Sequence, residues 1–267
     1  MAFLDRLDRA WSLSRSNLCV GLDPDLSKMP SRFSSQPNGI ADFCIEIINA
    51  TADLVCAFKP QIAYFAAQRA EDQLETICNY IRSSHPDVVL ILDAKRGDIG
   101  STAANYAIEA YDRFGADAVT VNPYLGTDSV EPFFEAGGGV IGLCRTSNPG
   151  GDDLQMLDTG GEPLFVRVAE MIAQRWSRLG DCGLVVGATY PNELSRVRQI
   201  VGDLPILVPG VGAQGGSADE VKANGSRSDG HGIIVNSSRA VLYASSGDDF
   251  ASAARLVADD TRQSCSP

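Results

Sequence analysis

Short apolar segments alternate with longer segments of helical period along almost the whole chain. The apolar segments are rich in β-branched residues and lack the apolar–polar alternation of a strand with one solvated face. This pattern is typical of parallel strands that are covered on both faces and followed by helices. We expect strands at 18–23, 54–60, 88–95, 118–123, 139–146, 183–189, 205–210 and 232–238, and helices near 41–52, 62–84, 102–115, 127–137, 163–179, 191–201, 217–224 and 248–262.

The number of strand–helix units indicates how the sheet closes. Eight units in 267 residues leave about 33 residues for each, which is the size of one βα unit. Eight units favour a closed (β/α)8 barrel, formed by residues 1–267 as a single domain. An open, doubly wound parallel sheet is the alternative.

Charge and cysteine content narrow the class of protein. The net charge of −12 argues against nucleic acid or an anionic membrane as a partner, since both are bound by clustered basic surfaces. No apolar stretch approaches the roughly 18 residues of a membrane span, and the N-terminal segment lacks the apolar region of a signal peptide. Seven cysteines without a C-x-x-C pair are typical of reduced core thiols in a cytoplasmic protein. With only two histidines, we expect no zinc or iron site.

The segment 145–161, after the fifth expected strand, is long, polar and rich in glycine. In a barrel it would lie at the carboxyl ends of the strands, where a mobile lid can cover a site. A flexible surface insertion explains the same composition equally well.

The segment Asp93-Ala-Lys95-Arg-Gly-Asp98 carries the strongest chemical signal. Asp93 and Lys95 are two residues apart at the end of the third strand, so both side chains should face the barrel mouth, with Asp98 within reach. Neighbouring carboxylates favour the charged form of a lysine. Such a lysine suits the role of general acid better than that of base or Schiff-base nucleophile. A structural ion pair at a strand end is the alternative.

Two further charges lie where strands end. Asp23 ends the first strand and Lys59 the second, and a charge after an apolar strand is costly unless it is paired. Surface salt bridges would explain either residue alone. However, the carboxyl ends of barrel strands converge, so these side chains should join Asp93, Lys95 and Asp98 in a chain of alternating charges that indicates an active site.

The glycine-rich segment 209–216 follows the seventh strand. Gly210, Gly212 and Gly215 formally match the dinucleotide pattern G-x-G-x-x-G, but no acidic residue ends a following strand to hold a ribose. Barrels commonly bind phosphate in this region, where glycine backbone N–H groups can approach the anion. Arg239, after the eighth strand, offers a forked guanidinium for the same phosphate, or is simply a surface arginine at a helix start. We therefore expect a phosphate site and no cofactor.

Together and in this order, these motifs resemble the orotidine 5′-phosphate decarboxylases of the larger bacterial (type 2) branch. The resemblance extends over nearly the whole chain, from LCVGLDPD to IIVNSSRAVLYAS, and is carried by FKPQIAYF, LDAKRGDIGST, RTSNP and LVPGVGAQGG. Ser238 departs from it, because the family often has glycine there. The resemblance implies decarboxylation of orotidine monophosphate (OMP) to uridine monophosphate (UMP) without a cofactor.

The resemblance also implies a role for each motif residue. Lys95 is the proton donor to C6 of the pyrimidine, Asp93 lies against the departing carboxylate, and Lys59 continues the chain of charges. Asp98 and Thr102 correspond to residues that reach the neighbouring subunit's site, so a homodimer with shared sites is implied. The remaining correspondences are substrate contacts: Asp23 at the ribose hydroxyls, Ser147 at the pyrimidine, Gln214 and Arg239 at the phosphate, and Pro209 beside them.

Two other functions stay open. Magnesium-dependent sugar-phosphate decarboxylases and synthases share the D-x-K-x-x-D strand, but resemble one another in having an acidic residue where Lys59 stands. A catalytically silent nucleotide-binding barrel would be expected to have lost Lys95 or one of its carboxylates, and all are present.

Overall fold

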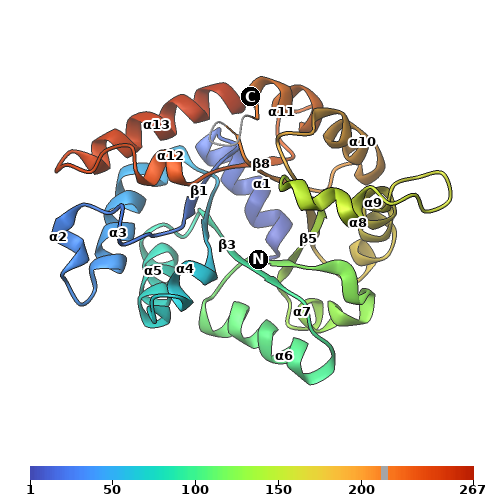
Figure 1. Ribbon diagram of the computed structural model, residues 1–267, viewed down its shortest axis with the longest axis horizontal. Helices are drawn as coiled ribbons and strands as arrows, with labels where there is room; N and C mark the ends of the chain where they lie inside the picture. The colour runs from blue at the N-terminus through green and yellow to red at the C-terminus, as the bar shows by residue number, and fades with distance from the viewer. Residues whose placement is uncertain (212–215) are drawn as a thin grey trace.

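The strands close into a barrel in which every strand is parallel to its neighbours and follows the order of the chain. The computed structural model describes residues 1–211 and 216–267 (Figure 1). Leu18 on the first strand pairs with Val235 on the last, which closes the sheet, so the predicted (β/α)8 barrel is confirmed and the open sheet is wrong. The strands are β1 (Leu18–Leu22), β2 (Ala57–Pro60), β3 (Val89–Arg96), β4 (Ala118–Val121), β5 (Gly139–Arg145), β6 (Cys182–Val186), β7 (Ile206–Pro209) and β8 (Ile233–Ser237).

Alternate residues of each strand face two different cores. Val89 and Ile91 on β3 belong to the cluster inside the barrel, whereas Leu90 and Leu92 belong to the larger cluster between strands and helices. Because side chains alternate across a strand and both faces are covered, the strands are apolar at nearly every position. This is why the sequence shows continuous apolar segments.

All eight predicted helical segments contain helix, and four of them are divided, namely 62–84, 102–115, 127–137 and 163–179. The segment 62–84 forms two helices, with Arg69 between them at a φ of 53°. The segment 102–115 is α-helical only to Ile108 and ends in a π-helix. The main helices are α3 (Gly39–Thr51), α4 (Ile62–Ala66), α5 (Glu71–Ser84), α6 (Gly100–Ile108), η2 (Glu109–Arg113), α7 (Glu131–Glu135), α9 (Leu164–Gln174), α10 (Pro191–Val201), α11 (Ala218–Gly225) and α13 (Phe250–Cys265).

Short helical turns connect these elements. None of the helices in the described part of the chain has both the length and the apolar character needed to cross a bilayer. The turns are α2 (Ser31–Ser34), η1 (Ala52–Leu54), η3 (Pro123–Leu125), η4 (Thr127–Ser129), η5 (Pro149–Gly151), α8 (Asp152–Gln155), η6 (Trp176–Arg178) and α12 (Arg239–Leu242).

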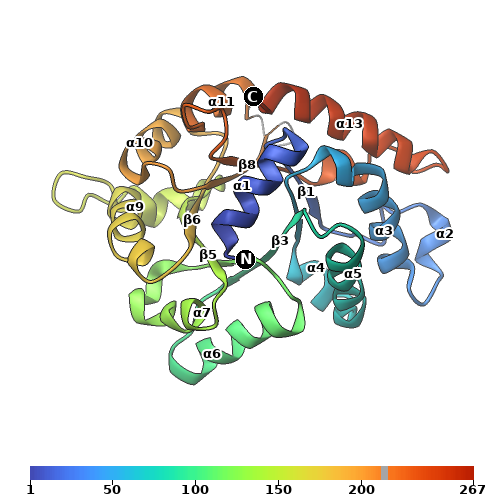
Figure 2. The ribbon, with the colours of Figure 1, turned by 180° about the vertical axis from the view of Figure 1, so that it is seen from behind.

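A helix that the sequence pattern did not predict closes the amino-terminal end of the barrel. Helix α1 (Phe3–Ser14) lies across that end (Figure 2). Its buried residues Phe3, Leu7 and Trp11 pack in the same cluster as the barrel interior. The opposite end, where the strands have their carboxyl ends, stays available for a site.

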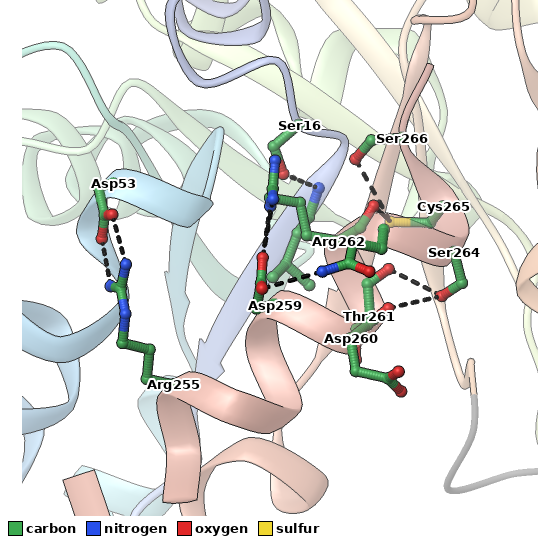
Figure 3. A network of polar contacts seen from close by, with 12 residues as sticks. Ser16, Asp53, Arg255, Asp259, Asp260, Thr261, Arg262, Ser264, Cys265 and Ser266 are labelled. Atoms are coloured by element: carbon green, nitrogen blue, oxygen red, sulfur yellow. Dashed lines mark hydrogen bonds and ion pairs between the residues drawn. The ribbon is translucent and has the colours of Figure 1, made fainter. Parts of the chain in front are cut away.

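A polar network holds the C-terminal helix against the start of the barrel (Figure 3). The guanidinium of Arg255 on α13 contacts both carboxylate oxygens of Asp53 in η1, at 2.6 and 2.8 Å. After α13, the Ser266 hydroxyl accepts a hydrogen bond from the backbone N–H of Asn17, at 3.0 Å. These contacts join the end of the chain to the residues that precede β1 and β2.

All seven cysteines are buried and unpaired. Burial raises the pKa of each thiol, for example to about 12 for Cys78 and Cys144. The cysteines are therefore core residues, as the sequence predicted, and their thiolates are disfavoured as nucleophiles.

Candidate active site

A cavity of about 160 Å³ opens between the carboxyl ends of β1, β2, β3, β7 and β8. Five residues that the sequence analysis selected contribute to its wall, although they come from distant parts of the chain. The lining residues are Asp23, Lys59, Asp93, Pro209, Gly210, Val211, Asn236, Ser237, Ser238 and Arg239.

A buried ion pair forms the floor of this cavity. Lys59 Nζ lies 2.7 Å from Asp93 Oδ2, and only 5% and 10% of the two side chains are exposed. Burial opposes the charged form of Lys59, but the carboxylates of Asp93 and Asp23 outweigh it and raise its pKa. Burial likewise opposes the charged form of Asp93, but Lys59 and Lys95 hold its pKa well below the usual value. Both groups are therefore charged at neutral pH.

Lys95 contacts the other oxygen of the same carboxylate. Its Nζ lies 2.6 Å from Asp93 Oδ1, and 45% of its side chain is exposed, so the ammonium group connects the buried pair with solvent. Lys95 itself is not among the residues that line the described cavity. The sequence analysis assumed regular strand alternation when it placed Asp93 and Lys95 on the same face, but the backbone of β3 is irregular at these residues. From Leu92 to Arg96 β3 advances four residues, while its neighbour β4 advances two, from Val119 to Val121.

The backbone of Lys95 itself is strained. Its φ is 48°, in the left-handed region that costs a non-glycine residue roughly 1–3 kcal/mol. Such strain persists only where surrounding contacts enforce it, and it is concentrated at functional sites. The bulge thus directs Lys95 toward Asp93.

Thr120 on β4 enforces this geometry, and the sequence analysis missed it. Its hydroxyl donates to Asp93 Oδ1 at 2.8 Å and accepts hydrogen bonds from the backbone N–H groups of Ala94 and Lys95, both at 3.0 Å. A threonine within an apolar strand is common, because β-branched residues favour strands. Its only distinguishing sign is its place near the end of a strand beside β3.

The residues after Lys95 turn away from the cavity. Arg96 pairs with Glu109 at 2.6 Å and lies over the ring of Tyr106, so it anchors the end of β3 to α6 and η2. Asp98 is partly exposed and Thr102, in the first turn of α6, is exposed. Across residues 1–211 and 216–267, Asp98 forms no ion pair with either active-site lysine. Within one chain, the predicted series of alternating contacts therefore runs only from Lys59 through Asp93 to Lys95.

Tyr243 fixes the loop that follows β1. Its hydroxyl donates to the backbone oxygen of Asp23 at 2.8 Å and accepts from the N–H of Asp25 at 2.7 Å. The carboxylate atom Oδ1 of Asp23 is buried and makes no hydrogen bond to any part of the chain that the structure describes. Tyr243 thus fixes the backbone of Asp23, while the carboxylate oxygen Oδ1 of Asp23 remains available as an acceptor at the cavity.

The segment predicted as a lid or a flexible insertion contains ordered turns. The buried guanidinium of Arg145, at the end of β5, lies over the Tyr190 ring at 3.8 Å from the centroid. The same group pairs with Asp152 at 2.6 Å and donates to Gln155 Oε1 at 3.3 Å. Arg145 therefore ties α8 to the loop after β6, a role that the sequence did not reveal.

Ser147, two residues after Arg145, is half-buried. Its backbone approaches Gly187 so closely that a Cβ there would lie 3.0 Å from Ser147 N and 2.8 Å from Ser147 Cβ. A side chain at position 187 would displace this loop. The glycine after β6 thus sets where Ser147 lies, outside the wall of the described cavity.

The expected phosphate region is described in part. Arg239 is exposed and begins α12, with Pro209 and Gly210 on the same cavity wall. Gln214 lies outside the described residues, as do Gly212 and Gly215. Ser238 is accommodated because Gly21 has no side chain: a Cβ there would lie 1.9 Å from Ser238 Oγ.

Comparison with known proteins identifies close relatives. A family model described as "Orotidine 5'-phosphate decarboxylase / HUMPS family" matches residues 16–255. An orotidine 5′-phosphate decarboxylase of Aromatoleum aromaticum is 61% identical over 264 residues, which cover 98% of this chain and 97% of the relative. One from an Azoarcus species is 58% identical over 263 residues, with 98% and 97% covered.

Solved structures show the same similarity. The OMP decarboxylase of Leishmania donovani has a TM-score of 0.84 with this chain at 35% identity, and 99% of each chain is covered. A UMP synthase structure from the same organism matches at 37% identity and a TM-score of 0.84, with 98% of this chain but 56% of that chain covered.

We predict that Asp93→Asn lowers the free energy of unfolding by about 3 kcal/mol at pH 7, because it leaves Lys59 buried beside a neutral group. The folded pKa of Asp93 is below its unfolded value of about 3.9, so its contribution is present above about pH 4 and is lost as the pH falls further. The pKa of Lys59 is raised in the folded state, so its contribution to the free energy of unfolding is fully present below about pH 10. Urea denaturation of the wild type and of Asp93→Asn, at pH 7 and at pH 3, measures the two free energies of unfolding.

A surface carboxylate provides the matched control. Asp87 pairs with Arg9, and both side chains are more than half exposed, so Asp87→Asn should cost less than about 1 kcal/mol. Equal stabilities of wild type and Asp93→Asn at pH 7, or a difference that stays the same at pH 3, would contradict the prediction.

Proposed function

The chain belongs to the orotidine 5′-phosphate decarboxylase / HUMPS family, and from this we propose that it converts OMP to UMP and CO2. The observation that carries the proposal is Asp93, buried at the barrel mouth between the ammonium groups of Lys59 and Lys95. The 61% identity to an orotidine 5′-phosphate decarboxylase over nearly the full chain supports it. We further propose that residues 1–267 form one catalytic domain that acts in the cytoplasm.

The reaction needs a stabilised negative charge and a proton. When the bond between C6 and the carboxyl carbon breaks, its electron pair stays on C6, and CO2 leaves. No adjacent π system accepts this charge, so a preorganised cation aimed at C6 lowers the barrier most effectively. Lys95 Nζ then transfers a proton to C6, which gives UMP, and its partly exposed side chain can recover a proton from solvent.

Asp93 and Lys59 act on Lys95 and on the substrate carboxylate. The Asp93 carboxylate holds the Lys95 ammonium group in place at 2.6 Å, and Lys59 keeps Asp93 ionised despite its burial. In the substrate complex, Asp93 lies against the departing carboxylate. Loss of CO2 removes that repulsion, so the same contact favours the transition state over the bound substrate.

The other residues bind the parts of OMP that do not react. Asp23 contacts the ribose hydroxyls through its unpaired oxygen, Ser147 contacts the pyrimidine, and Arg239 contacts the phosphate beside Pro209. Gln214 is assigned to the phosphate on sequence alone. Binding energy from the remote phosphate drives closure of the segment 145–161 and is expressed mainly in the transition state, so a substrate without phosphate should react more slowly.

A homodimer with shared sites accounts for Asp98 and Thr102. Asp98 is partly exposed and Thr102 is exposed, and neither lines the described cavity of its own chain. Exposed apolar side chains occur on the connections that follow the neighbouring strands β3 and β4: Ile99 is 60%, Tyr124 76% and Leu125 46% exposed. Apolar side chains gathered in this way are typical of a protein interface. In the dimer, Asp98 and Thr102 complete the partner's site.

No observation favours the magnesium-dependent alternative. Lys59 provides an ammonium group at the position where those enzymes are expected to have an acidic ligand. Activity in the presence of EDTA distinguishes the two functions directly.

We predict that the purified protein consumes OMP in the presence of EDTA, measured as the loss of OMP absorbance. Lys95→Ala should lower kcat by about 10²- to 10⁴-fold, because the proton donor is gone. Lys222→Ala is the matched control, since this lysine on α11 bonds to the backbone oxygen of Ser266, away from the cavity. A wild-type protein without activity would contradict the proposed function. Lys95→Ala at the wild-type rate would contradict only the role of Lys95.

The shared sites predict complementation between inactive variants. A purified mixed dimer of one Lys95→Ala chain and one Asp98→Asn chain should have one intact site of two, hence about half of the wild-type activity. A mixed dimer of Lys95→Ala and Asp93→Asn should stay inactive, because each site then lacks one of these residues. Equal inactivity of both mixed dimers would show that Asp98 does not act across the interface.

A further inference from the structure

We propose that Thr120 is a positioning residue for this decarboxylation: its hydroxyl holds the Asp93 carboxylate and the backbone of Lys95 in one fixed arrangement. The inference rests on the proposed function and extends it to a residue that does not line the described cavity. Thr120 is 1% exposed, so it acts through its neighbours rather than on the substrate.

The Thr120 hydroxyl uses every hydrogen-bonding position that it has. A threonine hydroxyl offers one hydrogen and two lone pairs. The hydrogen goes to Asp93 Oδ1 at 2.8 Å, and the lone pairs accept the N–H groups of Ala94 and Lys95 at 3.0 Å each. The hydroxyl orientation is thereby determined, because only the carboxylate can accept its hydrogen.

The bulge in β3 explains why such a residue is required. At a bulge, backbone N–H groups lose their partners on the neighbouring strand, and a buried N–H without a partner is costly. The two N–H groups that Thr120 accepts lie between Leu92 and Arg96, where the register with β4 shifts. Thr120 therefore replaces the missing ladder contacts, and it stabilises Lys95 at its φ of 48°.

The same hydroxyl also fixes the carboxylate. Asp93 Oδ1 receives both the Thr120 hydroxyl and Lys95 Nζ, while Oδ2 receives Lys59 Nζ. Three donors from three strands thus determine the carboxylate plane. Without the hydroxyl, the carboxylate could rotate and Lys95 Nζ would follow it, and small misplacements of a reacting group cost up to about 100-fold in rate.

The test compares Thr120→Val with Thr120→Ser. Valine keeps the branched shape but removes the hydroxyl, so kcat should fall by about 10- to 100-fold, as for loss of a hydrogen bond to a charged group. The affinity for UMP, measured by calorimetry, should change little, because UMP lacks the carboxylate that meets Asp93. Serine restores the hydroxyl and should bring kcat to within about threefold of wild type, since it lacks only the branch that stiffens χ1.

A buried threonine elsewhere controls for the substitution itself. Thr51 on α3 is fully buried, and its hydroxyl donates to the backbone oxygen of Ile47 at 2.8 Å. Thr51→Val should leave kcat unchanged. Equal kcat in wild type and Thr120→Val, or a parallel loss of kcat and UMP affinity that serine does not restore, would overturn the inference.

Amide hydrogen exchange gives a readout that does not depend on activity. The N–H groups of Ala94 and Lys95 should exchange faster in Thr120→Val, and in the smaller variant Thr120→Ala if valine prevents folding, but should stay protected in Thr120→Ser. Unchanged protection in Thr120→Val would contradict the proposed positioning of the bulge. Inert wild-type protein would instead contradict the proposed function, and the exchange rates would still decide whether Thr120 holds these groups.

Discussion

The ion pair between Lys59 and Asp93 is the constraint on which the rest of the site depends. A carboxylate with so little exposure cannot remain charged unless cations and hydrogen-bond donors surround it. Lys59, Lys95 and Thr120 meet this requirement from three different strands. The Asp93 carboxylate is therefore charged but largely held apart from bulk water, and electrostatic interactions act most strongly in such an environment.

The barrel supplies this arrangement because its strands converge at their carboxyl ends. Helix α1 fills the opposite end with Phe3, Leu7 and Trp11, so the polar residues are confined to one mouth. Within that mouth, glycines provide space at two close approaches, Gly21 beneath Ser238 and Gly187 beneath Ser147. The local irregularities, namely the β3 bulge and the strained Lys95 backbone, occur at the carboxylate itself.

The sequence predicted the barrel well, since apolar segments and helical period are local patterns. It also indicated four site residues, because charges that end apolar strands are conspicuous: Asp23, Lys59, Asp93 and Lys95. Contacts between distant segments left no such local trace. Thr120 reads as an ordinary strand residue, and Arg145 acts through Tyr190, 45 positions later. The prediction did not include helix α1, although its buried residues Phe3, Leu7 and Trp11 recur at helical spacing. The length, polarity and glycine content of the segment 145–161 do not indicate the contacts that Arg145 makes to it.

The most direct test of the central claim is a double-mutant cycle on kcat/KM for OMP with Lys59→Ala, Asp93→Ala and both together. If the buried pair acts as one unit, the double variant should be no more than about threefold slower than the slower single variant, because the first substitution already disrupts the unit. Losses that multiply across the cycle would show that Lys59 and Asp93 act independently, and would contradict the account.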